Sequence, residues 1–206
     1  MQGSKHKCAG LPFAIINMMK EQWQLYDNQG NALVGQGATK DEVFCKGLLH
    51  GAAHVWIWRI NEGDVEVLLQ KRAANKQTWP NKFDISAAGH IDLGEEPLIA
   101  ALRETKEEIG LIVNKADLKL ININYAYMVA ENKAIEHEFQ WVYLLNISSS
   151  FDFTIQKSEV ACLEWKKLDL FKAEVNDKHT QDLYVPHGGI YFQTVINAIE
   201  VASTVS

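Results

Sequence analysis

Residues 89–111 have the sequence GHIDLGEEPLIAALRETKEEIGL, and this stretch decides the fold. Pro97 suits the first position of a helix and Gly110 suits its C-terminal end, so the pattern predicts a helix between them. Glu104, Glu107 and Glu108 then lie at i, i+3 and i+4, on one arc of that helix. The neighbouring arc forms a buried stripe of side chains at helical spacing: Leu98, Ala101, Leu102, Thr105 and Ile109.

Three carboxylates this close together repel one another, and a bound cation is the natural compensation. Ligand sets made only of oxygen atoms favour Mg²⁺ over zinc, with Mn²⁺ as a substitute. Such an ion can neutralise a diphosphate, polarise a P–O bond and lower the pKa of an attacking water. The alternative interpretation of the same three glutamates is a solvated acidic helix face.

Composition and charge exclude several classes of protein. With 206 residues, 47% hydrophobic and 22% charged, the chain has the make-up of a soluble globular protein that can bury a sizeable core. A net charge of −6 argues against a broad nucleic-acid-binding face. Three widely spaced cysteines favour a reducing compartment, and no apolar run is long enough for a membrane span. We therefore expect a cytoplasmic protein without nucleic-acid or membrane partners.

The chain is expected to divide into an N-terminal extension, residues 1–48, and a main domain, residues 49–206, that together form one compact unit. Residues 1–17 precede Met18 and Met19 and are interpreted either as an extension upstream of the start or as added sequence, so no functional prediction rests on them. Apolar segments on either side of the turn residues 28–31 predict a β-hairpin within the extension. Its exposed edge could join a second subunit, so a homodimer is a further expectation.

The remaining elements alternate between strands and helices. Residues 39–42 have the form of a capping box for a short helical turn. A final helix is expected over residues 191–202, and no repeats or low-complexity linkers are present. This order indicates an α+β domain with a mixed β-sheet sandwiched between helices. The expected strands and extended segments cover residues 52–60, 65–70, 83–88, 118–127, 139–145 and 161–165.

Seven residues fall at the spacing G-x5-E-x7-R-E-x-x-E-E-x-G, namely Gly89, Glu95, Arg103, Glu104, Glu107, Glu108 and Gly110. This pattern resembles a complete Nudix box. The resemblance implies the Nudix fold and metal-dependent cleavage of a diphosphate linkage, in a nucleoside diphosphate derivative or a related organic pyrophosphate.

The same resemblance implies a role for each motif residue. Glu104, Glu107 and Glu108 would carry metal, and Glu107 and Glu108 would be catalytic. Arg103 would act with them by orienting a glutamate, with Glu95 as its expected partner. The two motif glycines, Gly89 and Gly110, would serve backbone geometry. Thr105 occupies a position that is usually aliphatic, which is a mild departure from the pattern.

A wider resemblance covers roughly residues 50 to 145. Residues 68–76, 79–80, 86–90 and 134–139 are similar to isopentenyl-diphosphate isomerases, which share the Nudix fold. This similarity implies that Arg72 and Lys76 contact the substrate diphosphate. It also implies that Glu136 and Glu138 serve metal binding and proton transfer, and Glu138 is the first choice as a metal ligand or general base. Alternation puts both glutamates and Gln140 on one face of a strand.

Isomerase activity requires a cysteine immediately before the Gly-His pair, and this chain has Ala88 at that position. Alanine cannot transfer a proton, and neither Cys45 nor Cys162 lies at a matching position. A metal-dependent pyrophosphohydrolase is therefore the main prediction. The isomerase and a non-catalytic Nudix-fold module that binds a nucleotide or sugar phosphate are the alternatives.

Histidines and tryptophans near the motif are further candidates. His54 and His90 align with metal-binding positions of the isomerase, and His90 is the better functional candidate because it adjoins Gly89. A structural role is expected for His50 and His54, and a turn for His187. Trp56, Trp58 and Trp79 are expected in the core rather than against a nucleobase. The loops over residues 146–157 and 175–187 are expected to select the group attached to the diphosphate.

Overall fold

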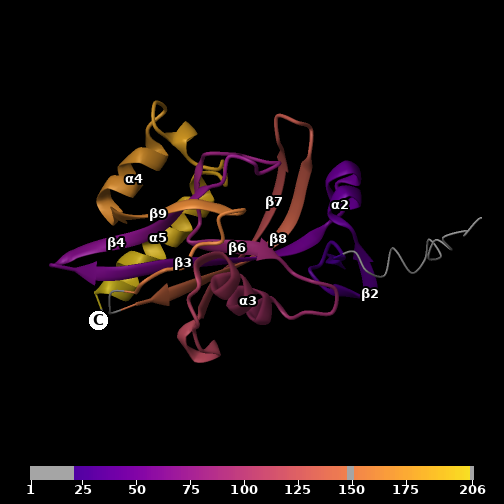
Figure 1. Cartoon of the computed structure of the whole chain (residues 1–206), viewed down its shortest axis with the longest axis horizontal. Helices are drawn as coiled ribbons and strands as arrows, with labels where there is room; N and C mark the ends of the chain where they lie inside the picture. Colours follow the sequence, from indigo (N-terminus) through magenta and orange to yellow (C-terminus); the bar gives the residue numbers. More distant parts are fainter. Residues whose placement is uncertain (1–20, 148–150, 205–206) are drawn as a thin grey trace, which may run out of the picture.

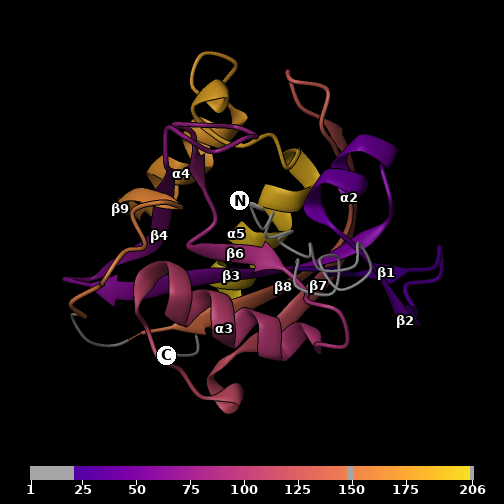
Figure 2. The ribbon, with the colours of Figure 1, turned by 45° about the vertical axis from the view of Figure 1, so that its right-hand side comes forward.

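The structure is a computed structural model that describes residues 21–147 and 151–204. The extension expected over residues 1–17 lies outside these described residues. Figure 1 shows the arrangement of the helices and strands, and Figure 2 shows the same ribbon turned by 45°.

A mixed sheet is built around β3 (His50–Asn61), a long strand buried along most of its length. On one side β3 pairs in parallel with β8 (Ile135–Asn146). On the other side it pairs antiparallel with β4 (Asp64–Arg72) and with β6 (Ala87–His90). The outer strands are β5 (Phe83–Asp84), β7 (Lys119–Val129) and β9 (Val160–Lys167).

Helices cover both faces of this sheet (Figure 2). Helix α3 (Pro97–Ile109) packs on one face, where Ala101 and Ile109 join a core with side chains from β3 and β8. Helices α4 (Leu168–Asn176) and α5 (Gly189–Ser203) pack on the other face, in a second core that contains Phe171 and Ile196. The predicted α+β architecture, a mixed sheet between helices, is confirmed.

The predicted N-terminal hairpin is also present. β1 (Trp23–Tyr26) and β2 (Ala32–Ala38) pair antiparallel, and Leu25 joins the hairpin to β3 opposite His50. Helix α2 (Lys40–Lys46) follows, with the backbone N–H of Thr39 donating to the Glu42 carboxylate at 3.1 Å, as in a capping box. Among the described strands, β2 pairs only with β1, so the outer edge of the hairpin is free.

Helix α3 begins and ends where the motif predicts. Pro97 is its first residue, and Gly110 ends it in the left-handed conformation with φ of 74°. Thr105 is fully buried on the stripe, where its hydroxyl donates to the carbonyl of Ala101 at 2.7 Å. This hydrogen bond explains how a polar side chain fits at a position that is usually aliphatic.

One helix was not predicted. Helix α4 starts directly after β9 without an intervening loop, and it buries Leu168, Phe171 and Val175. Its C-terminal end and the short 3-10 helix η2 (Gln181–Leu183) occupy part of the segment 175–187 that was expected to be a loop. A second 3-10 turn, η1 (Lys115–Asp117), links α3 to β7. The final helix α5 is confirmed, and it begins two residues earlier than predicted.

Candidate active site

The motif loop and α3 are joined through Arg103. Its guanidinium donates to both carboxylate oxygens of Glu95, at 3.0 and 2.8 Å, and to the carbonyl of His90 at 2.9 Å. It also contacts Glu104 at 2.5 Å and Glu107 at 3.4 Å. A planar guanidinium can bridge several acceptors in fixed directions. Arg103 therefore fixes the motif loop, which carries His90 and Glu95, relative to the glutamates of α3.

Gly89 stands where no side chain fits. A Cβ atom built on this residue would lie 2.0 to 2.5 Å from the carboxylate atoms of Glu104. The glutamate is thus packed directly against the backbone of β6, which explains why the motif requires glycine at this position. Gly89 therefore brings the helix and the strand close enough for Glu104 to reach the same pocket as its neighbours.

Two glutamates of α3 are removed from solvent to different degrees: Glu108 is buried and forms no ion pair with a lysine or arginine of the described residues, whereas Glu104 is mostly buried and is paired with Arg103. Burial, followed by the charge of Glu104, raises the pKa of Glu108 to about 8. Burial also raises the pKa of Glu104 to about 7, against the opposing effect of Arg103. Glu108 accepts hydrogen bonds from the N–H of Ala88 at 2.9 Å and from the Gln70 amide at 3.3 Å. Carboxylates with raised pKa values are common where a site is built to receive a cation.

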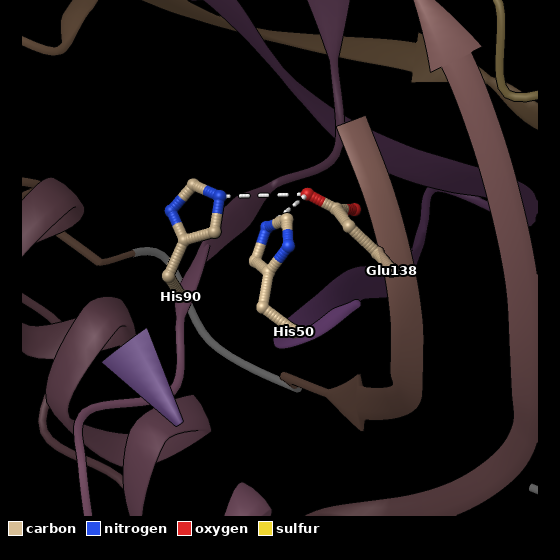
Figure 3. Close-up of side chains that lie close together, drawn as sticks. All are labelled: His50, His90 and Glu138. Carbon is tan, nitrogen blue, oxygen red and sulfur yellow. Dashed lines mark ion pairs between the residues drawn. The ribbon is translucent and has the colours of Figure 1, made fainter. Parts of the chain in front are cut away.

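A second group of ligand-type side chains surrounds Glu138 (Figure 3). The parallel pairing of β3 with β8 sets His50 opposite Glu138, and β6 brings His90 to the other side of β3. Oε1 of Glu138 lies 3.2 Å from Nε2 of His50 and 3.4 Å from Nε2 of His90. One ligand atom from each residue lies within 4.8 Å of the other two. This triad is the group of described residues whose spacing suits a metal ion.

The contacts of this triad fit a cation. Nε2 of His50 is buried and has no hydrogen-bond partner, because its geometry toward Glu138 is not that of a hydrogen bond. Although burial opposes ionisation, the two histidines hold the pKa of Glu138 well below its usual range. Burial, followed by the charge on Glu138, raises the pKa of the neighbouring Glu136. An ionised carboxylate beside a buried imidazole nitrogen is a donor set that accepts a divalent ion.

The N-terminal hairpin contributes directly to this region. The Trp23 ring stacks on His90 with 3.5 Å between ring centroids and an angle of 8° between the planes. Trp23 also stacks on His50 at 5.4 Å and packs edge-on against Phe44 of α2. Residues from the predicted extension therefore orient two of the histidines.

The two cations predicted to contact a diphosphate have partners within the protein. Nη1 of Arg72 donates to Asp84 at 2.9 Å, and its other nitrogens donate to the carbonyl of Thr78. Lys76 is paired with Glu159. Both side chains nonetheless line the same pocket as the glutamates. Each could turn a donor toward a phosphate only by sharing or exchanging its present acceptor.

Three further residues line that pocket: His54, Asp84 and His187, which we call the histidine set. Nε2 of His187 lies 2.8 Å from Oδ1 of Asp84, so His187 forms part of the site and is more than a turn. His54 is nearly inaccessible and lies beside Tyr191, not beside Glu138. The three residues come from β3, β5 and the loop before α5, and no motif spacing connects them.

The tryptophans divide between core and pocket. Trp56 and Trp58 are buried in the core on the α5 side, as predicted. Trp79 is partly buried against the small core formed by Trp23, Val43 and Phe44, and it also lines the pocket, where its Nε1 donates to Glu136 at 3.4 Å. Its φ of 50° is unusual for a large side chain and marks a tight turn at this point.

Most of the candidate site residues line one pocket of about 480 Å³, although His50, Glu95, Trp56 and Trp58 are not among its lining residues. We call Glu104, Glu107, Glu108 and Glu138 the acidic set. Carboxylates outnumber lysines and arginines around the pocket, which favours a cation as one of its occupants. The carboxylate residues are Glu21, Asp84, Asp92, Glu104, Glu107, Glu108, Glu136, Glu138 and Glu159.

Comparison with known proteins identifies the family of this chain. A model of the NUDIX domain matches residues 48–185, well over half of the chain. The chain belongs to the Nudix family. The Nudix resemblance and the Nudix fold are thereby confirmed. A crystal structure of a Nudix hydrolase from M. smegmatis covers 89% of this chain and 96% of its own, with a TM-score of 0.52 and 18% identity, which shows similarity of fold alone.

Some relatives of this Nudix protein are named Nudix hydrolases, and others are named isopentenyl-diphosphate Delta-isomerases. It is 32% identical to Nudix hydrolase 3 of Arabidopsis thaliana over 82% of the chain, but it spans only 22% of that relative. An uncharacterized Nudix hydrolase of Listeria monocytogenes is 36% identical over 68% of the chain and 76% of its own length. An isopentenyl-diphosphate Delta-isomerase of Aliivibrio fischeri is 30% identical over 82% of the chain and 92% of its own length.

Among residues 21–147 and 151–204, no helix combines the length and apolar character needed to cross a membrane.

Proposed function

We propose that this Nudix protein is a metal-dependent hydrolase that cleaves a diphosphate linkage in a small organic substrate. The observation that carries the proposal is the convergence of the acidic set on one pocket, supported by the unpartnered nitrogen of His50 beside Glu138. The relatives named Nudix hydrolases point to the same reaction class. Mg²⁺ is the proposed ion, with Mn²⁺ as a substitute, because most of the donors are carboxylate oxygens.

The proposed ligands are Glu104, Glu107, Glu108 and Glu138, with His50 and His90 beside the last of these. A divalent ion bound there would neutralise the diphosphate and make a bound water a stronger nucleophile. The fit of the donors rests on chemistry seen at the site, since Glu108 is buried without an ion-pair partner among the described residues and Glu104 lies close enough to raise its pKa. Arg103 holds Glu104 in place by a direct hydrogen bond, and it is itself anchored by Glu95 of the motif loop.

Proton transfer and substrate positioning fall to other groups. Because Glu138 is held ionised by two histidines, it suits a ligand better than a proton acceptor. Glu108, whose pKa burial raises to about 8 in the metal-free protein, retains more affinity for a proton and would serve as the base only in a state in which it is not a metal ligand. Arg72 and Lys76 are proposed to contact the diphosphate by exchanging Asp84 and Glu159 for phosphate oxygens.

An isomerase is a second candidate because some relatives carry that name and because the triad of His50, His90 and Glu138 is present. Against it stands Ala88, whose methyl group cannot exchange a proton with a substrate carbon. Among the described residues the cysteines Cys45 and Cys162 are exposed and do not line the pocket. The hydrolase is therefore the function we propose.

The test is a product analysis of the purified protein with Mg²⁺ or Mn²⁺ and a panel of nucleoside diphosphate conjugates, nucleoside triphosphates and prenyl diphosphates. We expect metal-stimulated cleavage of at least one diphosphate linkage. Conversion of isopentenyl to dimethylallyl diphosphate would instead support the isomerase. An absence of metal-stimulated cleavage across the panel would leave a non-catalytic binding module.

A further inference from the structure

Strand β7 forms an outer edge of the sheet and carries a row of exposed apolar side chains. Among residues 21–147 and 151–204, β7 pairs with β8 and with no other strand, and no loop donates a backbone hydrogen bond to its outer side. Ile123, Tyr125, Tyr127 and Val129, which we call the β7 row, alternate along one face, and each is between 49% and 59% exposed. Single exposed apolar residues are normal on a protein surface, but a continuous row marks an interaction surface.

The apolar surface continues from the β7 row towards the N-terminal hairpin. Tyr125 lies opposite Phe139 of β8, with 5.5 Å between the ring centroids, and its hydroxyl is hydrogen-bonded to Nε2 of His137 at 2.7 Å. A Cβ atom built on Gly30, in the turn of the hairpin, would lie 3.7 Å from the Phe139 ring. The row is therefore held in place on its inner side, and the hairpin turn lies at its rim.

The edge of β7 lacks the features that keep a strand from pairing with another chain. Such edges are commonly protected by charged side chains, proline or bulges. Residues 120–130 have the sequence LININYAYMVA, without a charged residue or a proline. The register shift of β7 lies near its start, between Leu120 and Asn122. By contrast, β2 at the edge of the hairpin pairs irregularly with β1 and holds Gly35 in the left-handed conformation. We infer that β7, not β2, is the edge open to another strand.

The sequence of β7 is nearly symmetric about Ala126. Tyr125 and Tyr127 flank this residue, and Ile123 and Val129 lie three positions away on either side. A two-fold interface requires such symmetry, because the same surface of each copy meets the other. We propose that β7 pairs antiparallel with β7 of a second copy of this chain, with Ala126 on the two-fold axis.

This register puts side chains of the same kind opposite each other. Tyr125 of one copy lies opposite Tyr127 of the other, and Ile123 lies opposite Val129. Residues that face each other across antiparallel strands point to the same side of the sheet, so both β7 rows form one apolar surface. The free N–H and C=O groups of the two edges become each other's partners.

Other occupants fit this edge less well. A nucleic acid requires lysine or arginine, which residues 120–130 lack, and the chain has a net charge of −6. A lipid surface cannot satisfy the backbone groups of an open strand edge. Each half-exposed tyrosine leaves about 100 Å² open, so the row and the backbone edge supply roughly half of the area per partner in a standard interface, about 800 Å². The hairpin turn beside Phe139 adds area at the rim.

The test is sedimentation equilibrium of the full chain, with single charges placed on the β7 row. We expect a dimer at about 10 µM protein. Ile123→Lys and Val129→Glu should each raise the dissociation constant at least about tenfold, because each puts an unpaired charge against an apolar side chain. The double variant puts the two charges opposite each other at both ends of the pairing, and should return the constant to within about threefold of the wild type. Val34→Lys, at a 94% exposed position on β2, is the control and should leave it unchanged.

A second measurement uses milder substitutions, in a chain whose other cysteines are changed to serine. A short bismaleimide should link Ile123→Cys chains to Val129→Cys chains in a mixture, and should link neither variant to itself. Links within a single variant, or none in the mixture, would overturn the register about Ala126, as would a double variant that is no tighter than the single ones.

The remaining outcomes decide whether the interface exists. A wild-type chain that stays monomeric at about 100 µM would overturn the proposal. A dimer that Ile123→Lys leaves intact, or that Val34→Lys weakens equally, would place the interface elsewhere and also overturn it. A monomer whose β7 amides are protected from hydrogen exchange would show that another segment of the same chain covers the edge. The β7 row includes no residue of the acidic set, so these results do not depend on the proposed reaction.

Discussion

The acidic set and the histidine set line one pocket, but the polar side chains of the two sets are compensated in different ways. Burial, followed for Glu108 by the charge of Glu104, raises the pKa values of Glu104 and Glu108, and we propose that a cation completes this part of the pocket. His54 and His187 are held by hydrogen bonds to Tyr191 and Asp84, and burial lowers the pKa of His54 to about 3. The difference teaches that the histidine set is held by partners within the protein, whereas the acidic set has the charge that a metal ion would balance under the proposed function.

The largest effect is expected from removing a charge from the acidic set. Glu107→Gln and Glu108→Gln should each lower turnover by roughly 10³-fold, because a metal ligand supplies several kcal/mol of charge stabilisation. Steady-state kinetics on the cleaved diphosphate measures the loss, and circular dichroism checks the fold. Glu131→Gln, an exposed glutamate outside the pocket, is the matched control and should retain full activity. Unchanged turnover in both pocket variants would remove the acidic set from the mechanism.

A smaller effect is expected from crowding one member of the acidic set. In Gly89→Ala the new methyl group would meet the Glu104 carboxylate, so this side chain must move away from its place. Affinity for Mn²⁺ should fall about 10- to 100-fold, as for changes that disturb the orientation of a metal ligand. Gly189→Ala is the control, since a Cβ there meets nothing within 4 Å. Wild-type metal affinity in Gly89→Ala would show that Glu104 does not bind the ion.

The acidic set should also respond to pH. The pKa of Glu104 is raised to about 7 and that of Glu108 to about 8, above their ordinary values. The stability that these protonated groups give the metal-free protein is therefore complete at low pH and is lost as pH rises through 7 and 8. Metal affinity changes in the opposite direction, because the ion requires the ionised forms.

We expect the dissociation constant for Mn²⁺ to fall about tenfold or more between pH 6.5 and 8.5. Calorimetry in two buffers of different ionisation enthalpy should detect the release of protons on binding. Glu108→Gln should reduce this release and should stabilise the metal-free protein at pH 9. Binding that is independent of pH over this range would contradict the raised pKa values.

The smallest effect is expected in the histidine set. Tyr191→Phe removes the hydroxyl that contacts His54 and Trp56 and keeps the ring, so the free energy of unfolding should fall by about 1 kcal/mol. For a chain of this size that corresponds to a melting temperature about 2–4 °C lower. Thermal unfolding without metal gives the measurement. Glu108→Gln should instead raise the free energy of unfolding at high pH, so the two variants should change stability in opposite directions. A lower free energy of unfolding in both variants would contradict this difference between the two sets.

The sequence predicted α3 and its glutamates because the signals are local. Pro97, the apolar stripe and Gly110 all lie within one helix, where the spacing of residues determines which side chains share a face. The alternation of Glu136 and Glu138 was predicted for the same reason, and both are buried on one face of β8. Helix α4 gave no comparable signal, because it follows β9 without a turn and has no capping hydrogen bond from a side chain.

The histidines could not be placed from the sequence because their neighbours come from distant segments. His50 meets Glu138 through the parallel register of β3 and β8, and no local pattern defines that register. His187 meets Asp84 across 103 residues. The partners of Arg72 and Lys76 were missed for the same reason, since Asp84 and Glu159 belong to other elements.

The most direct test of the central claim is hydrolysis in water enriched with oxygen-18. A diphosphate conjugate that the protein cleaves is incubated with Mg²⁺, and the products are examined by mass spectrometry. We predict that one phosphate product gains a single oxygen-18 atom, that the label appears only with a divalent ion, and that Glu108→Gln prevents it. Cleavage that proceeds equally well in excess chelator, or products without the label, would contradict a metal-dependent attack of water at the acidic set.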